Sequence, residues 1–289
     1  MTIKYTFSGH DSFQCKDLWL KKGYDFVSEN KIFSDNSSVV DLGVGRNMVS
    51  SIRYWLKSFG ITDEDGLPTE FGNLILSDDG YDPYIENFGT LWLLHYKIVT
   101  LRIATIYNLF FAEFHKEYKE FNQEQLMKFI KRKCSEIQFL YNENTLKTDI
   151  GVLFKSYLKP ENGEKSIDEF SSLLIDLDLL ELSSSQQVNR TFKFKYQDSK
   201  KIDIEIALFV LLDYFEGQKV IYFLGLSNLF SMFCIDPEEL IDILTSIMEH
   251  YSAIVYSNDA GIKQVQIISD LDKWQVLSNY FNKTNFISR

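Results

Sequence analysis

Apolar residues recur at helical spacing between residues 39 and 60, and glycines divide this stretch. The pattern predicts a short helix over 39–42 and a longer helix from about 46 to 58, with a turn at 43–45. Gly60 is the expected C-terminal cap of the longer helix. Its apolar face comprises Met48, Val49, Ile52, Trp55, Leu56 and Phe59. A short helix, a glycine-containing turn and a longer helix are typical of a helix-turn-helix.

The residues on either side complete a predicted N-terminal module. An amphipathic helix is expected within 15–30, where apolar residues alternate with lysines. After the longer helix, turn residues surround short apolar runs, as in a wing or a capping helix. The segment "TEFGNLIL" reads as a short helix, with Thr69 as its cap. We predict a helix-turn-helix or winged-helix-like module over residues 1–85.

Residues 86–200 form the predicted helical middle region. The stretch 86–122 is strongly apolar and predicts a buried helix, and a further helix should begin after the cap residue Asn122. A capping-box pattern at Ser166 and Glu169 predicts another helix start. Alternation of polar and aromatic residues over 191–196 indicates a strand.

Residues 201–289 predict a second winged-helix-like module. A buried helix is expected over 202–215, and another should begin with Asp236 as cap and Pro237 in the first turn. Two strands are predicted around a turn at 258–261. Because the second of these helices carries four acidic residues, we expect this module to bind protein or to pack internally. The fold class is thus mainly α, or α+β, with small antiparallel hairpins.

Composition and charge limit the partners. The chain has 289 residues and a net charge of −11, which disfavours a non-specific nucleic-acid binder. Residues 1–60, however, hold eight Lys/Arg against six Asp/Glu, a charge of +2, so the remainder carries −13. No segment predicts a membrane span or a signal peptide. Three widely spaced cysteines fit no disulfide framework, which favours the reducing cytoplasm.

Candidate DNA contacts lie in this basic N-terminal part. Arg46 and Asn47 would begin the longer helix, where free N–H groups favour a phosphate. The full predicted set is Arg46, Asn47, Arg53, Lys57, Lys21 and Lys22. The alternative is a solvated basic face that docks an acidic protein. A nucleotide-binding phosphate loop at 43–47 is disfavoured, because the third glycine and the Lys-Ser/Thr pair are missing.

Candidate catalytic chemistry is concentrated in the sequence "SGHDS", residues 8–12. His10 would be a general base, with Asp11 and Ser8 beside it. Adjacent residues of an extended segment point in opposite directions, so Asp11 would hold His10 only in a tight turn. The alternative is that Ser8, Asp11 or Ser12 caps a helix and His10 bonds locally.

Other candidates carry weaker signals. A set of carboxylates could ligate Mg²⁺ or form a plain acidic turn, which we favour: Asp78, Asp79, Asp82 and Glu86. No metal ligand is therefore assigned. His95 is expected in the core, and His115 and His250 at the surface or at helix ends.

The segments "FSGHDSF", "LWLKKGYDFV", "VVDLGVGRNMVSSIRYWLKSFGI", "LPTEFGNLIL", "DPYIENFGTLWLLHY" and "TLKTDIGVLFKSYL" resemble the bacterial domain-of-unknown-function family 4007. The resemblance implies SspB-type components of bacterial DNA phosphorothioation, an anti-phage defence of the restriction-modification kind, which are described as DNA nickases. It also implies three partner proteins: a cysteine desulfurase, an ATP-pyrophosphatase-like sulfurtransferase and an ATPase.

Two main hypotheses follow. In the first, the chain binds DNA and nicks it to allow sulfur insertion, with Mg²⁺ as a candidate cofactor. In the second, it is a non-enzymatic winged-helix scaffold that joins the modification enzymes to DNA. A regulator of the defence operon is a third, and a homodimer is compatible with each.

Overall fold

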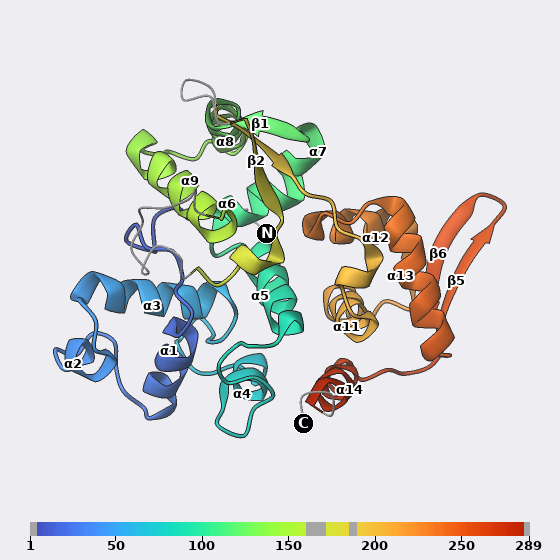
Figure 1. The fold of residues 1–289 in the computed structure, drawn as a ribbon, viewed down its shortest axis with the longest axis horizontal. Helices are drawn as coiled ribbons and strands as arrows, with labels where there is room; N and C mark the ends of the chain where they lie inside the picture. The colour runs from blue at the N-terminus through green and yellow to red at the C-terminus, as the bar shows by residue number, and fades with distance from the viewer. Residues whose placement is uncertain (1–4, 160–171, 185–189, 286–289) are drawn as a thin grey trace. The chain divides into compact units, whose positions relative to one another are not determined.

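The computed structural model describes residues 5–159, 172–184 and 190–285, and the chain divides into two compact units (Figure 1). The first unit spans Met1–Lys195 and the second Tyr196–Arg289. Both are mainly helical, and each contains one small antiparallel sheet, as an α+β fold predicts. The predicted boundary near residue 85 lies inside the first unit and stays a prediction.

The N-terminal helices follow the hydrophobic pattern closely. They are α1 (Trp19–Ser28), α2 (Ser38–Leu42), α3 (Arg46–Ser58) and α4 (Glu70–Leu76). Gly43 ends α2 in the left-handed conformation at φ 65°, and Gly60 follows α3 at φ 69°. Thr69 caps α4 by accepting a hydrogen bond from the Gly72 amide at 3.0 Å. In the described part of residues 1–85, the only β pairing is a single bridge between Thr62 and Pro68.

The continuous helix predicted over 86–122 is wrong, because the segment breaks into shorter elements. These are α5 (Phe88–Thr100), α6 (Thr105–Asn108), the π-helix η1 (Leu109–Phe114) and α7 (His115–Glu117). Arg102 has φ 60°, which no right-handed helix accepts. The Asn108 amide donates to the Val99 carbonyl at 2.9 Å, so a side chain replaces helical backbone bonding at the break. Hydropathy alone did not reveal this interruption.

The rest of the first unit contains a three-stranded sheet, of which the sequence predicted only the strand within 191–196 in an otherwise helical region. Its elements are β1 (Glu120–Asn122), α8 (Gln123–Glu136), α9 (Glu143–Tyr157), η2 (Ile175–Leu177), β2 (Leu180–Ser184) and β3 (Thr191–Phe194). The strand order is β1-β3-β2. Three residues of β1 are too few to show a strand period in sequence. Asn122 forms the capping box of α8 with Gln125, as its sequence position predicted. Ser166 and Glu169 lie outside the described residues.

The second unit confirms the predicted helices and hairpin. Its elements are η3 (Ser199–Lys201), α11 (Ile204–Tyr214), β4 (Val220–Tyr222), α12 (Phe223–Phe230), η4 (Ser231–Phe233), α13 (Pro237–His250), β5 (Ile254–Asp259), β6 (Ile262–Ile267) and α14 (Lys273–Asn285). Asp236 caps α13 through hydrogen bonds from two backbone amides at 2.9 and 3.0 Å. Ala260 and Gly261 both have positive φ in the hairpin turn. The strand order is β4-β6-β5.

The two sheets share one topology. In each, a helical segment is followed by a strand, two helices and a two-stranded hairpin, and the last strand lies in the middle of the sheet. Buried residues occupy matching positions: Phe121 and Phe192 in the first sheet, Ile221 and Val265 in the second. This repeat is not visible as sequence similarity.

Each unit buries its own apolar core. The largest enclosed side chains of the first unit include Trp55, Trp92 and Phe110, and those of the second include Phe209 and Phe230. The three cysteines are free thiols in these cores. Within the described residues, no helix is long and apolar enough to cross a membrane.

Candidate nucleic-acid interface

Helix α3 separates an apolar face from a polar one. Val49, Ile52 and Trp55 are buried, whereas the opposite side exposes Arg46, Asn47, Ser50 and Arg53. This is the arrangement that the sequence predicted. Four polar side chains on thirteen residues of rigid helix form a continuous surface that can donate hydrogen bonds to phosphate or to base edges.

No side chain caps the backbone of the turn that precedes α3. Gly45 occupies the N-cap position with extended φ and ψ, and no side chain caps the helix there. A Cβ atom added at Gly43 or Gly45 would meet no atom within 4 Å. The Arg46 guanidinium donates to Asn36 Oδ1 at 3.0 Å, which holds the arginine beside this turn. At the other end, Lys57 donates to the Glu64 carbonyl at 2.6 Å and is half-buried.

The SGHDS segment forms a compact loop against α3. Ser8, Asp11 and Ser12 all have positive φ, at 67°, 43° and 69°. Non-glycine residues avoid this region, so three in five positions mark a loop that its surroundings hold in place. A hydrogen bond from Ser51 Oγ to the His10 carbonyl at 3.0 Å joins the loop to α3. The two candidate sites of the sequence therefore lie side by side.

Close packing fixes the loop at Gly9 and Phe13. A Cβ atom at Gly9 would lie 2.1 Å from the Tyr54 ring, so only glycine fits at this approach. The Trp55 indole donates to the Phe13 carbonyl at 3.2 Å. Burial, and after it the negative charge of Asp149, raise the pKa of Tyr54 well above its ordinary value, so its hydroxyl stays protonated.

His10 is buried, with 1% of its surface exposed, and both ring nitrogens face polar groups of the protein. Nδ1 accepts a hydrogen bond from the Ser12 amide at 3.2 Å. That bond requires a bare Nδ1, so the neutral ring carries its proton on Nε2. Nε2 lies 3.1 Å from Asp149 Oδ1, in a close electrostatic contact that falls outside hydrogen-bond geometry. The ring also stacks on Trp55 at an interplanar angle of 13°.

Asp149, on α9, is the carboxylate that the sequence analysis missed. It is 2% exposed, and both of its oxygens accept from the Ser8 amide at 3.1 Å. Asp11, the partner considered for His10, is exposed instead. The segment "TLKTDIGVLFKSYL" contains Asp149 at an otherwise buried helical position, and a lone carboxylate on an apolar face was the available signal.

Two expectations about this loop are settled by its geometry. The alternative that Ser8, Asp11 or Ser12 caps a helix is wrong, because α1 begins only at Trp19 and follows Leu18 without a side-chain cap. The expectation that His10 bonds locally is confirmed by its contact with Ser12. Ser8 and Ser12 remain exposed on the outside of the loop.

The two lysines predicted on α1 differ in environment. Lys21 is buried and pairs with Asp25 at 2.6 Å and Asp78 at 2.7 Å, so two carboxylates balance its charge. Hydrogen bonds to both carboxylates outweigh burial and raise the pKa of Lys21. Lys22 is exposed. Of this pair, only Lys22 presents its charge to a ligand.

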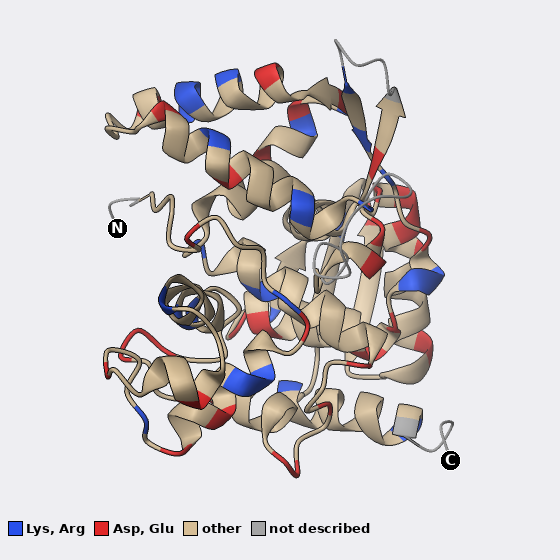
Figure 2. Ribbon diagram, turned by 60° about the vertical axis from the view of Figure 1, so that its left-hand side comes forward, with Lys and Arg blue, Asp and Glu red and all other residues tan. Residues whose placement is uncertain are grey.

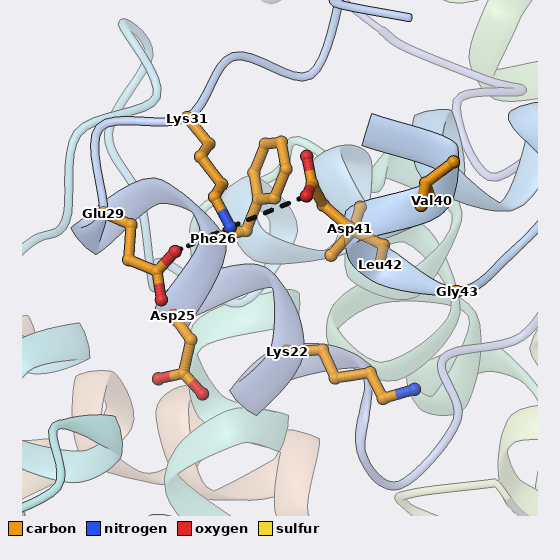
Figure 3. Close-up of a pocket in the computed structure, with 9 residues that line it drawn as sticks. All are labelled: Lys22, Asp25, Phe26, Glu29, Lys31, Val40, Asp41, Leu42 and Gly43. Carbon is orange, nitrogen blue, oxygen red and sulfur yellow. Dashed lines mark ion pairs between the residues drawn. The ribbon is translucent and has the colours of Figure 1, made fainter. Parts of the chain in front are cut away.

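Lys22 stands at the rim of a surface hollow between α1 and α2 (Figure 3). The hollow measures about 380 Å³, and its apolar lining residues are Phe26, Val40 and Leu42. Lys31 pairs across it with Glu29 at 2.7 Å and with Asp41 at 3.8 Å. Lys22 and Asp25 add one charge of each sign, so the hollow offers no concentrated charge of one sign.

The acidic turn at 78–86 is structural where its contacts are described. Asp82 accepts hydrogen bonds from the Glu86 and Asn87 amides at 2.9 and 3.0 Å and from Thr90 Oγ1 at 2.6 Å. Asp78 pairs with Lys21. Among the residues that the structure describes, no cluster of three or more His, Cys, Asp and Glu side chains is suited to hold a metal ion.

The other histidines divide between core and surface. His95 is fully buried, with Nδ1 2.8 Å from the Tyr157 hydroxyl, as predicted. His115 is buried, so of its two expected positions, the surface or a helix end, it occupies the helix end, at the start of α7. Burial, followed by two neighbouring lysines, lowers the pKa of His115 to about 4. His250 is exposed at the end of α13, as predicted.

Charged residues of both signs are distributed over the whole ribbon (Figure 2). On α8, for example, Lys128 pairs with Glu124 and Arg132 with Glu117. In contrast, the exposed Arg53 on α3 has no ion-pair partner among the described residues. Within the predicted set, positive charge therefore remains available on the outer face of α3 and at Lys22.

Comparison with known proteins agrees with this architecture. Two crystal structures are similar to the chain, and each match covers 96% of this chain and 88% of that chain. A magnesium ion-bound SspB structure matches with a TM-score of 0.83 at 23% identity, and another SspB structure with 0.81 at 24%. These likenesses establish the fold.

No curated protein matches the sequence. The family model described as "Protein of unknown function (DUF4007)" matches residues 7–281, which is nearly the whole chain. The chain belongs to the DUF4007 family.

Proposed function

We propose that this protein is the DNA-binding component of a DNA phosphorothioation defence system and that α3 and the SGHDS loop together form its DNA surface. The observation that carries the proposal is their juxtaposition: Ser51 on α3 bonds to His10 in the loop, and Gly9 of the loop packs against Tyr54, one helical turn from the exposed Ser50. The family membership and the likeness to SspB structures support the choice of system.

The proposed contacts are phosphate contacts from a rigid platform. Arg46 and Arg53 lie seven residues apart on α3, two helical turns or about 10 Å. Both would reach one backbone strand, with Asn47 between them. Phosphate contacts fix a protein on the duplex without reading its sequence. We therefore expect binding that depends strongly on salt and weakly on sequence.

Nicking is proposed with His10 in a positioning role. A general base needs a nitrogen within hydrogen-bond reach of its nucleophile, and His10 is 1% exposed, with both nitrogens directed at groups inside the protein. Ser8, Asp11 and Ser12 are the exposed groups of the loop and remain the candidates for contact with a scissile phosphate. Mg²⁺, present in one of the similar structures, is the first ion to test.

The repeated sheet topology supports a second candidate, the scaffold function. The order helix, strand, helix, helix, hairpin over 105–194 and again over 204–267 is that expected of winged-helix modules. Such modules often bind protein as well as nucleic acid. In this alternative the chain presents DNA to the modification enzymes and cuts nothing.

Fluorescence anisotropy with a labelled duplex tests the DNA surface. Arg46→Ala with Arg53→Ala should weaken binding uniformly across sequences and reduce the slope of log K against log salt by roughly 1.8. The matched control is Lys128→Ala with Arg132→Ala, which removes the same charge from α8. Equal affinities for wild type and the Arg46/Arg53 variant would refute the assignment.

A supercoiled-plasmid assay separates nickase from scaffold. Wild type and His10→Ala are compared with Mg²⁺, with Mn²⁺ and with EDTA, beside a Ser12→Ala variant. Open circles that disappear in EDTA indicate a metal-dependent nickase. If the protein binds the plasmid and yields no open circles in any condition, the scaffold function replaces the nickase.

A further inference from the structure

The outer face of the second sheet exposes apolar side chains and almost no charge. Ile221 and Val265 point into the core, so the alternate residues of the three strands point outward. The outward residues are Val220, Tyr222, Gln266, Gln264, Ile262, Val255, Ser257 and Asp259. Tyr222 is 64% exposed, Ile262 56% and Val220 44%. The one charged member, Asp259, lies at the hairpin tip.

The first sheet supplies an internal comparison, because it has the same topology. The row Val220, Gln266 and Val255 of the second sheet corresponds in register to the row Glu120, Lys193 and Glu181 of the first. There Lys193 pairs with Glu181 at 2.6 Å, and Thr191 donates to Glu120 at 3.0 Å. The same architecture thus accepts a charged, solvated outer face.

The contrast indicates that the second sheet uses its outer face differently. An apolar face offers no advantage to a sheet that stays in water, and uncharged aromatic and aliphatic groups are what the centre of a protein interface contains. No Lys or Arg lies on the face, so it has nothing with which to neutralise phosphate. A protein surface is the occupant that fits.

The charge of the second unit selects between two kinds of protein occupant. Residues 196–289 contain seven Lys/Arg and thirteen Asp/Glu, a net charge of −6. A second copy would bring the same negative charge to the contact, whereas a basic protein would be attracted to it. We propose that the outer face of the second sheet docks a different protein, one with an uncharged apolar patch bordered by Lys and Arg.

The test uses three probes whose choice rests on the proposed function: the purified cysteine desulfurase, sulfurtransferase and ATPase of the same system. Binding to immobilised full-length chain is measured for wild type and for Tyr222→Glu, whose exposed side chain allows normal folding. Glu120→Ser, at the corresponding edge of the first sheet, is the matched control. One probe should bind wild type and the control equally and Tyr222→Glu at least about tenfold more weakly.

Three results would overturn the proposal. They are failure of all three probes to bind wild type, equal binding by Tyr222→Glu, and equal loss in the Glu120→Ser control. Sedimentation of the chain alone provides a fourth: a wild-type dimer that Tyr222→Glu dissociates would assign the face to a second copy. DNA affinity of Tyr222→Glu should equal that of wild type. The proposal of the DNA surface and the proposal of this docking face can therefore be refuted independently.

Discussion

Replacement of Asp149 by alanine should destabilise the first unit more than any surface change. The variant removes the charged acceptor of the Ser8 amide, a loss of roughly 1.5–3 kcal/mol. It also removes the electrostatic contact with the buried His10 Nε2, which we set at roughly 1–3 kcal/mol. Together these give about 2.5–6 kcal/mol. Asp149→Asn keeps one acceptor oxygen and should lose about half as much.

Urea denaturation followed by tryptophan fluorescence measures this loss. Trp19, Trp55 and Trp92 lie in the first unit, so its transition dominates the signal. A double-mutant cycle with His10→Ala isolates the pair, and we expect a coupling energy of about 1–3 kcal/mol. A loss below about 0.5 kcal/mol for Asp149→Ala, or strict additivity with His10→Ala, would show that the pair does not hold the loop.

Two further predictions follow from buried positions. The pKa of His115 is near 6.5 in the unfolded chain and about 4 in the folded chain. The free energy of unfolding therefore has its full value above pH 6.5 and falls as the pH drops toward 4. The change is about 1.4 kcal/mol per pH unit. His115→Phe, beside Phe194, should abolish about 2 kcal/mol of the loss between pH 7 and 5 in urea titrations; an unchanged pH dependence would contradict this. Gly9→Ala should cost about 1–3 kcal/mol against the Tyr54 ring, whereas Gly45→Ala should cost less than about 0.5, and equal melting temperatures would contradict the packing argument.

The N-terminal helices were predictable because local rules determine them. The bounds of α3 follow from amphipathic spacing between two glycines, and Thr69, Asn122 and Asp236 cap the helices that their sequence positions indicate. In these elements, propensity, patterning and capping agree. The hairpin of the second unit was predictable for the same reason, since its turn residues stand between two alternating segments.

The remaining features depend on contacts between distant residues. The break at Arg102 is stabilised by the Asn108 side chain, which no hydropathy pattern reveals. Strand β1 exists because β3, more than seventy residues later, pairs with it. The partner of His10 is Asp149, 139 positions away, so sequence proximity suggested Asp11 instead. The sequence predicted the candidate residues of α3, but it did not predict that the SGHDS loop packs against this helix.

The long span of the Ser8–Asp149 contact has a consequence for the order of folding. These residues are 141 positions apart, whereas β4 and β6 of the second unit join Val220 to Gln266. Closing a longer segment of chain costs more entropy and slows the step that requires it. The helices α1 to α4 can form early from local contacts, but the SGHDS loop acquires its strained shape only after α9 is in place. A nascent or partly folded chain therefore carries the α3 face without its companion loop, and the proposed DNA surface is completed as one of the last events of maturation.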